Sequence, residues 1–210
     1  RYQMMTHIDR WVLTQLLVTL SDELAALPNL HLAVNLSATS LDDPTFIPFL
    51  EDLLDRSTVA PERLTFEITE TTVVNQLSSA SELLARIREK GSKVALDDFG
   101  SGFSSFNYLK HFQVDFIKID VENHEPAVIR GGAGVISRFQ PAIVFEAGHW
   151  EEKPEDRESI RDTLEPLGYR IAGILIEHGI VETDWDTYLG FEDPFMKEFY
   201  CNVLCLPSRS

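Results

Sequence analysis

The chain has 210 residues, of which 44% are hydrophobic and 25% are charged, and its formal net charge is −16 at pH 7. This length and composition predict one globular domain, residues 1–210, with a sizeable core. No segment approaches the roughly 20 apolar residues of a membrane span, and no signal peptide is visible. We therefore expect no membrane partner. Because acidic side chains outnumber basic ones by 34 to 18, we also expect no binding to a nucleic-acid polymer.

The cysteine content indicates a reducing compartment. The chain has two cysteines, Cys201 and Cys205, four residues apart near its end. A strand would place both on the same face without forcing a bond, so we interpret them as free thiols of a cytoplasmic protein. A disulfide or a metal pair is the alternative interpretation.

Helical apolar spacing alternates with short apolar runs along the chain. Helices are predicted at residues 6–27, 42–54, 77–90, 106–109, 126–139 and 155–167, with the fifth interrupted by glycines. Strands are predicted at residues 31–36, 64–68, 94–96, 116–119, 142–145, 170–176 and 201–206. Residues 177–199 are predicted to be an irregular cover that carries Trp185, Tyr188, Phe191 and Phe195. This alternation predicts an α/β fold with a mainly parallel sheet of about seven strands.

Polar residues occur in or just after five successive predicted strands: Asn35, Glu67, Asp97, Lys118 and Glu146. Consecutive members lie about one βα unit apart, and the carboxyl ends of parallel strands share one edge of a sheet. Amide and carboxylate oxygens suit Mg²⁺ or Mn²⁺. The adjacent pair of aspartates that begins with Asp97 would serve two metals, and Lys118 would neutralise a phosphate or orient a water.

The same pattern has a purely structural interpretation, because an aspartate after a strand is often only the N-cap of the next helix. Glu67 has an equally plain alternative as an exposed strand residue. Residue type and spacing leave both interpretations open.

Four segments identify a resemblance to a known family: residues 35–37, 66–70, 95–102 and 114–120, which read NLS, FEITE, ALDDFGSG and VDFIKID. They closely resemble the EAL family, which comprises cyclic-di-GMP phosphodiesterases on a TIM-type barrel. The opening helix is similar as well, and the likeness covers residues 1–120.

The resemblance implies a metal-dependent hydrolysis of a cyclic dinucleotide. It assigns Asn35, Glu67 and Asp97 as metal ligands, Asp98 as the ligand of a second metal, and Lys118 as the residue that positions the water. Asp120 belongs to the same motif as Lys118. Glu70 resembles the glutamate that steadies the loop at 99–105, and we expect Glu146 to substitute for a distal ligand.

Two departures from the family pattern affect these expectations. The Glu-x-Leu strand of the family precedes its opening helix, and this sequence begins after that point, so one metal ligand and the first barrel strands are missing from it. After Asp120, residues 116–132, 141–146 and 202–206 instead resemble the C-terminal half of FkbM-type methyltransferases. We therefore predict a chimera of an EAL-like half, residues 1–120, and a methyltransferase-like half, residues 121–210.

These departures leave several alternatives for fold and function. The sheet is expected to be an incomplete TIM-type barrel or an open Rossmann-like sheet. The leading function is binding or weak hydrolysis of a cyclic dinucleotide; a methyltransferase relative and a non-catalytic scaffold are the alternatives. No glycine-rich cofactor-binding turn follows an early strand. An open sheet edge would favour a homodimer.

Overall fold

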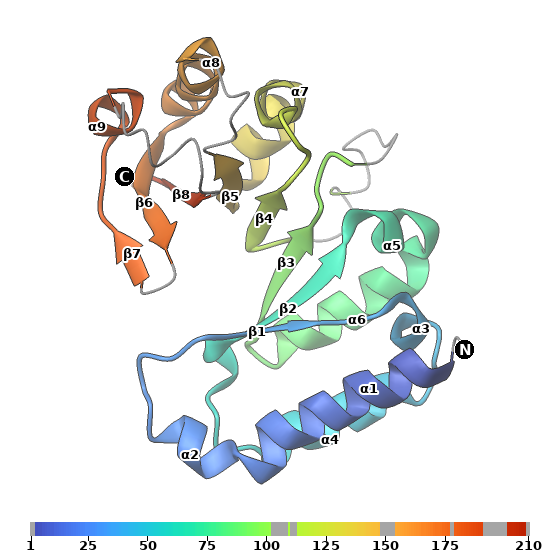
Figure 1. Ribbon diagram of the computed structural model, residues 1–210. Coiled ribbons are helices and arrows are strands. Elements are labelled where there is room, and N and C mark those ends of the chain that lie inside the picture. The colour runs from blue at the N-terminus through green and yellow to red at the C-terminus, as the bar shows by residue number, and fades with distance from the viewer. Residues whose placement is uncertain are drawn as a thin grey trace. The chain divides into compact units, whose positions relative to one another are not determined.

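The computed structural model describes residues 3–101, 109, 113–147, 154–176, 179–190 and 201–208. Its strands are β1 Leu32–Asn35, β2 Leu64–Thr69, β3 Lys93–Asp97, β4 Phe116–Ile119, β5 Ala142–Ala147, β6 Tyr169–Ile176, β7 Gly179–Val181 and β8 Cys201–Pro207. They form one sheet in the order β1-β2-β3-β4-β5-β8-β6-β7 (Figure 1). The predicted mainly parallel α/β fold is confirmed, with β7 as a strand that the sequence did not predict.

The chain divides into two compact units. One comprises Arg1–Leu96 and Tyr108–Val114, and the other comprises Asp97–Asn107 and Asp115–Ser210. The predicted division into halves at residue 120 stays a prediction. Among the helices of the described residues, none is both long and apolar enough to cross a membrane.

The N-terminal unit packs helices against β1 and β2, which pair in parallel. Its helices are α1 Gln3–Thr14, α2 Ser21–Ala25, α3 Ala38–Leu41, α4 Phe46–Arg56, α5 Glu70–Asn75 and α6 Leu77–Glu89. In Figure 1, α1 and α4 run side by side. Strand alternation places Leu64, Phe66 and Ile68 in the core, where each is at most 1% exposed.

The prediction of one continuous helix at 6–27 is wrong, because that segment is interrupted. A π-helical turn, Gln15–Thr19, separates α1 from α2, and the Leu20 N–H donates to the Gln15 carbonyl five residues earlier. The wider turn follows a change in the apolar spacing, because Leu13 and Leu17 are buried but Leu20 is 43% exposed.

The C-terminal unit contains β4 to β8 together with α7 Glu125–Phe139, α8 Pro154–Leu164 and α9 Trp185–Leu189. Strand β4 pairs in parallel with β5, whereas β8 runs antiparallel to both β5 and β6. The glycines do not interrupt α7, which is continuous. Tyr188 is fully buried on α9 and makes an edge contact with Phe145 on β5.

The two cysteines are not linked by a disulfide. Cys201 and Cys205 are both buried on one face of β8, and burial raises the pKa of the Cys205 thiol. Two other predictions fall largely on residues outside the described ones: the helix at 106–109, apart from Leu109, and Phe191 with Phe195.

Candidate functional site

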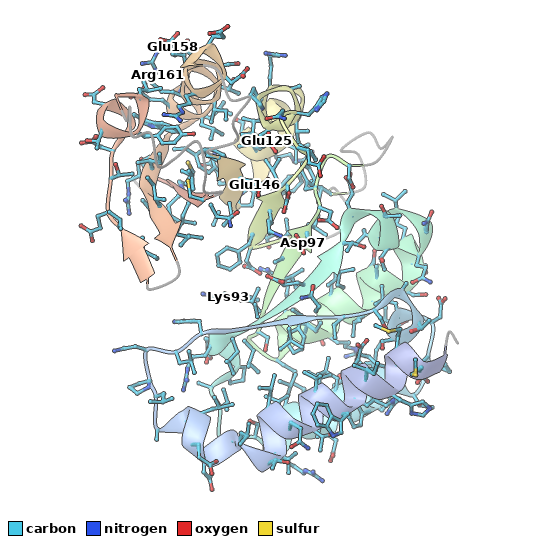
Figure 2. All side chains as sticks on the ribbon, in the orientation of Figure 1. Lys93, Asp97, Glu125, Glu146, Glu158 and Arg161 are labelled. Carbon is cyan, nitrogen blue, oxygen red and sulfur yellow. The ribbon has the colours of Figure 1, made fainter. Side chains whose placement is uncertain are left out.

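In the C-terminal unit, charged side chains gather where β3 and β4 end. The Lys118 Nζ lies 3.0 Å from Asp97 Oδ1 and 3.5 Å from Asp120 Oδ2. Figure 2 shows Asp97 at the end of β3. Lys118 is half-buried on β4, where strand alternation turns it away from the buried Ile117 and Ile119. The structure therefore brings Asp97, Lys118 and Asp120 together, as their positions at strand ends predicted.

The backbone after Asp97 follows a tight course that fixes Asp98. Asp98 has φ of 53°, a left-handed conformation that aspartate tolerates better than most residues. Its N–H donates to Asp97 Oδ1 at 2.9 Å. The next N–H, that of Phe99, donates to the Lys118 carbonyl at 3.0 Å, so the turn is attached to β4.

Two groups at this edge have raised pKa values, although burial acts on them in opposite directions. Burial raises the pKa of the Asp98 carboxyl, and the negative charge of Asp97 raises it further. For Lys118, burial alone would lower the pKa, but hydrogen bonds and charges from Asp97 and Asp120 outweigh it and raise the pKa. Lys118 therefore stays protonated at neutral pH and supplies positive charge among three carboxylates.

In the N-terminal unit, Asn35 and Glu67 are Cα partners on the parallel strands β1 and β2. Asn35 is exposed and Glu67 is half-buried, while Val34 and Phe66 on the opposite face are buried. The two predicted ligands of this unit therefore lie on one face of the sheet. Glu70 begins α5 and is only 1% exposed; its predicted loop partner at 99–105 lies partly outside the described residues.

Glu146 lies in another environment of the C-terminal unit. It lies on β5, where Figure 2 labels it, and it is the Cα partner of Asn202 on the antiparallel β8. With Glu125 and Asp156 it lines a cavity of about 20 Å³, enough for about one water. Its role as a metal ligand stays a prediction.

The metal expected at these residues fits their donor chemistry. Carboxylate and amide oxygens are hard ligands, and the raised pKa of Asp98 reflects burial and a repulsion between carboxylates that a divalent cation would relieve. Within the described ranges, however, no three acidic, histidine or cysteine side chains are arranged closely enough to hold a metal by themselves. Donor type is therefore appropriate, and Lys118 provides the positive charge at Asp97.

Sequence comparison agrees with the motifs at these strand ends. Residues 1–123, more than half of the chain, match the EAL domain family. The chain belongs to the EAL domain family. Cyclic di-GMP phosphodiesterase PdeB of Shewanella oneidensis is 33% identical over 120 residues, which are 57% of this chain and 14% of that protein. The chain spans only 12–16% of the length of five curated relatives that are 33–40% identical to it.

Solved structures extend this similarity to the fold. The FimX EAL domain of Pseudomonas aeruginosa, bound to c-di-GMP, has a TM-score of 0.57 at 28% identity and covers 74% of this chain and 64% of its own. BlrP1 of Klebsiella pneumoniae, a manganese and c-di-GMP complex, has a TM-score of 0.57 at 24% identity, covers 77% of this chain and 41% of its own, and is similar in fold alone.

The comparisons give no support for a methyltransferase segment or for a chimera. The structural similarity to FimX covers 74% of this chain, which is a larger part of it than residues 1–123 of the family match. The predicted relation of residues 121–210 to FkbM-type methyltransferases is therefore not supported.

Sequence reasoning missed two buried acids beside the candidate ligands. Asp9 and Glu125 are each 6% exposed, and Glu125 accepts the Val121 N–H at 3.1 Å, just after Asp120. Asp9 had a detectable signal, because its spacing of four from Leu13 places it on the buried face of α1. An acid on an apolar helical stripe usually has a specific polar partner.

Proposed function

We propose that this EAL domain binds cyclic di-GMP with a divalent metal, Mg²⁺ or Mn²⁺, and hydrolyses it weakly. The observation that carries the proposal is the Lys118 ammonium between Asp97 and Asp120, with the Asp98 N–H bonded to Asp97, in a chain of this family. Membership alone would not supply the chemistry, but this geometry places a cation and three carboxylates at one strand edge.

The proposal assigns metal-binding roles to Asn35 and Glu67 in the N-terminal unit and to Asp97 and Asp98 in the C-terminal unit. A bound divalent metal supplies Lewis-acid chemistry that lowers the pKa of an attacking water. Glu146 keeps its proposed role as a distal ligand.

The protein's own side chains have separate tasks in this proposal. Lys118 carries its proton at neutral pH because Asp97 and Asp120 raise its pKa, so it attracts the phosphodiester and holds the attacking water. Asp120 orients the Lys118 ammonium. Glu70 keeps its proposed loop-stabilising role. Activity is expected to be weak because Lys118 already engages Asp97 at 3.0 Å.

An assay of linear dinucleotide formed from cyclic di-GMP with Mn²⁺ tests the hydrolytic part. We expect slow turnover by the parent chain and at least about 100-fold less with Asp97→Asn, because a direct metal ligand is lost. Asp162→Asn makes the same charge change at an exposed ion pair on α8 and should keep the parent rate. No turnover by the parent chain, or equal turnover by Asp97→Asn, would remove the enzymatic function.

A second candidate function, that of a methyltransferase relative, is suggested by the C-terminal unit. Its last strand in the chain, β8, lies antiparallel between β5 and β6, as expected of a methyltransferase-like sheet. We place this candidate second because Asn35-Leu36-Ser37 is not a glycine-rich cofactor turn. A higher Tm with S-adenosylmethionine would favour it, and an unchanged Tm would eliminate it.

A further inference from the structure

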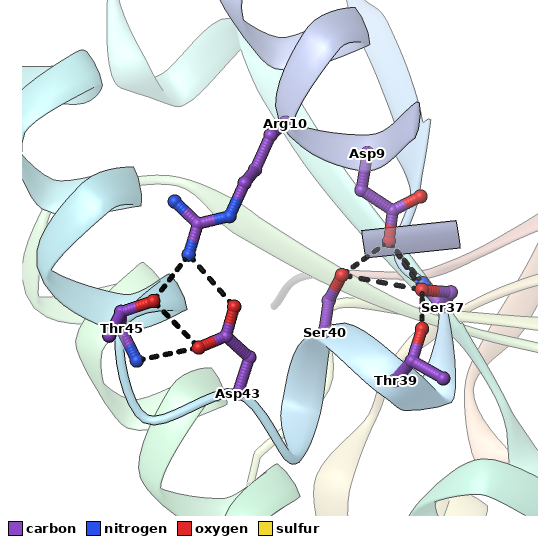
Figure 3. A network of polar contacts seen from close by, with 7 residues as sticks. All are labelled: Asp9, Arg10, Ser37, Thr39, Ser40, Asp43 and Thr45. Atoms are coloured by element: carbon purple, nitrogen blue, oxygen red, sulfur yellow. Dashed lines mark hydrogen bonds and ion pairs between the residues drawn. The ribbon is translucent and has the colours of Figure 1, made fainter. Parts of the chain in front are cut away.

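A buried aspartate on α1 binds the chain just beyond Asn35. One oxygen of Asp9, Oδ2, accepts the Ser37 N–H at 2.9 Å, the Ser37 hydroxyl at 2.6 Å and the Ser40 hydroxyl at 2.6 Å (Figure 3). Asp9 is 6% exposed and Ser40 is 1% exposed. Three donors from a segment 28 to 31 residues away therefore converge on a single buried carboxylate oxygen.

The carboxylate replaces a local cap for α3. Ser37 is the N-cap residue of α3, but its own side chain makes no capping hydrogen bond. Its hydroxyl points to Asp9 instead, so the start of α3 is fixed from another helix. Hydrogen bonds to a charged oxygen are roughly twice as strong as neutral ones, and negative charge is favoured at a helix N-terminus. The start of α3 is therefore held by hydrogen bonds to a carboxylate on α1.

The next residue of α1 holds the other end of the same segment. Arg10 donates to Asp43 Oδ2 at 2.9 Å and to Thr45 Oγ1 at 2.8 Å, and its guanidinium lies 4.4 Å from the centre of the Phe49 ring. Thr45 is the N-cap residue of α4. Figure 3 shows Asp9 and Arg10 of α1 in contact with the two ends of the segment 37–45.

These contacts leave little freedom at the end of β1. The Leu36 N–H donates to the Glu67 carbonyl at 2.9 Å, and the following N–H, that of Ser37, donates to Asp9. The two backbone N–H groups that follow Asn35 are therefore held by different elements, the first by β2 and the second by α1. Its own side chain is exposed, so its backbone is fixed while its amide group stays accessible to a ligand.

We infer that Asp9 is a positioning residue, which holds the strand end so that Asn35 presents its amide oxygen to the metal. The inference rests on the proposed function for its consequence at the metal, but not for the anchoring itself. It predicts that weakening the Asp9 contacts loosens Leu36 and Ser37 and thereby lowers metal affinity.

The test compares Asp9→Asn with Ser21→Ala in the full chain. Asn keeps the shape of Asp but offers a neutral oxygen. Ser21 is a matched control, because it is also 6% exposed and accepts a loop N–H, that of Thr58, at 2.8 Å. Three quantities are measured for each: Tm, amide hydrogen exchange at Leu36 and Ser37, and the Kd for Mn²⁺ alone from calorimetry.

We expect both variants to lower Tm, but only Asp9→Asn to speed exchange at Leu36 and Ser37, by about ten-fold. The Kd for Mn²⁺ should rise about ten-fold with Asp9→Asn and stay unchanged with Ser21→Ala. If Asp9→Asn does not fold, Ser40→Ala removes one donor from Asp9 and should cause smaller changes of the same kind.

Two results would overturn the inference: exchange at Ser37 no faster in Asp9→Asn than in Ser21→Ala, or faster exchange with an unchanged Kd for Mn²⁺. Absence of Mn²⁺ binding by the parent chain is a different result. It would overturn the proposed function, while the exchange measurement would still decide whether Asp9 anchors the strand end.

Discussion

At the scale of single residues, Asp98 shows a conflict between the candidate site and stability. It occupies a left-handed backbone position with φ of 53°, and its pKa is raised by burial and then by Asp97. A raised pKa means that native Asp98 holds a proton more tightly than Asp98 in the unfolded chain. Its favourable contribution to folding is therefore present at low pH and is lost as pH rises through the raised pKa.

We predict that Asp98→Asn stabilises the metal-free protein at pH 7, because Asn tolerates the left-handed position and removes the repulsion from Asp97. The gain should be less than about 1 kcal/mol, since Asp98 is largely exposed despite the partial burial that raises its pKa, and solvent screens its charge. Urea unfolding in EDTA measures it at pH 7 and pH 3.5, and the gain should shrink at the lower pH. A less stable variant at pH 7, with Asp162→Asn unchanged, would contradict this explanation.

Several predicted site residues were identifiable from the sequence because their chemistry is local. Asp97 and Lys118 follow or lie within short apolar runs that the structure confirms as β3 and β4. Their contact follows because β3 and β4 are neighbours in the sheet. The spacing of Asp9 signals its burial but not its partners, because Ser37 and Ser40 lie 28 and 31 residues away and only tertiary packing brings them to it.

At the scale of elements, long periodic segments were predicted better than short ones. The spacing at 77–90 predicted α6, which is observed at Leu77–Glu89, whereas α3, α5, β7 and α9 have three to six residues each and were missed. Elements this short are set by contacts and caps, such as the Asp184 side chain that accepts the Thr187 N–H, and a spacing pattern needs more residues to be recognised.

Two glycines of the C-terminal unit should respond to alanine in opposite ways. Gly100 has φ of +96°, and a Cβ there would lie 2.5 Å from Cγ2 of Val128 on α7. Gly134 is exposed within α7 and has open space around it. A side chain at Gly100 is therefore disfavoured by the positive φ and by the close approach of Val128, whereas glycine at position 134 only weakens α7.

We predict that Gly100→Ala lowers the free energy of unfolding by about 1–3 kcal/mol, through backbone strain and the collision with Val128. Gly134→Ala should raise it by about 0.5–1 kcal/mol, because alanine favours the helix. Urea unfolding of both variants measures the two changes. Equal effects of the two substitutions would show that α7 does not pack on the turn that carries Asp98.

At the scale of the whole molecule, the net charge of −16 opposes the binding of an anionic dinucleotide. Lys118 supplies positive charge at the candidate site, but Asp97, Asp98 and Asp120 surround it in sequence and space. Binding of cyclic di-GMP therefore requires additional positive charge, which a divalent metal would provide. This requirement makes metal dependence the central claim.

Calorimetric titration of cyclic di-GMP into the full chain, once with Mn²⁺ and once with EDTA, tests that claim most directly. We predict saturable binding with Mn²⁺, loss of binding in EDTA, and loss of the Mn²⁺-dependent binding in Asp97→Asn but not in Asp162→Asn. Equal binding with Mn²⁺ and with EDTA, or no binding in either condition, would contradict the claim.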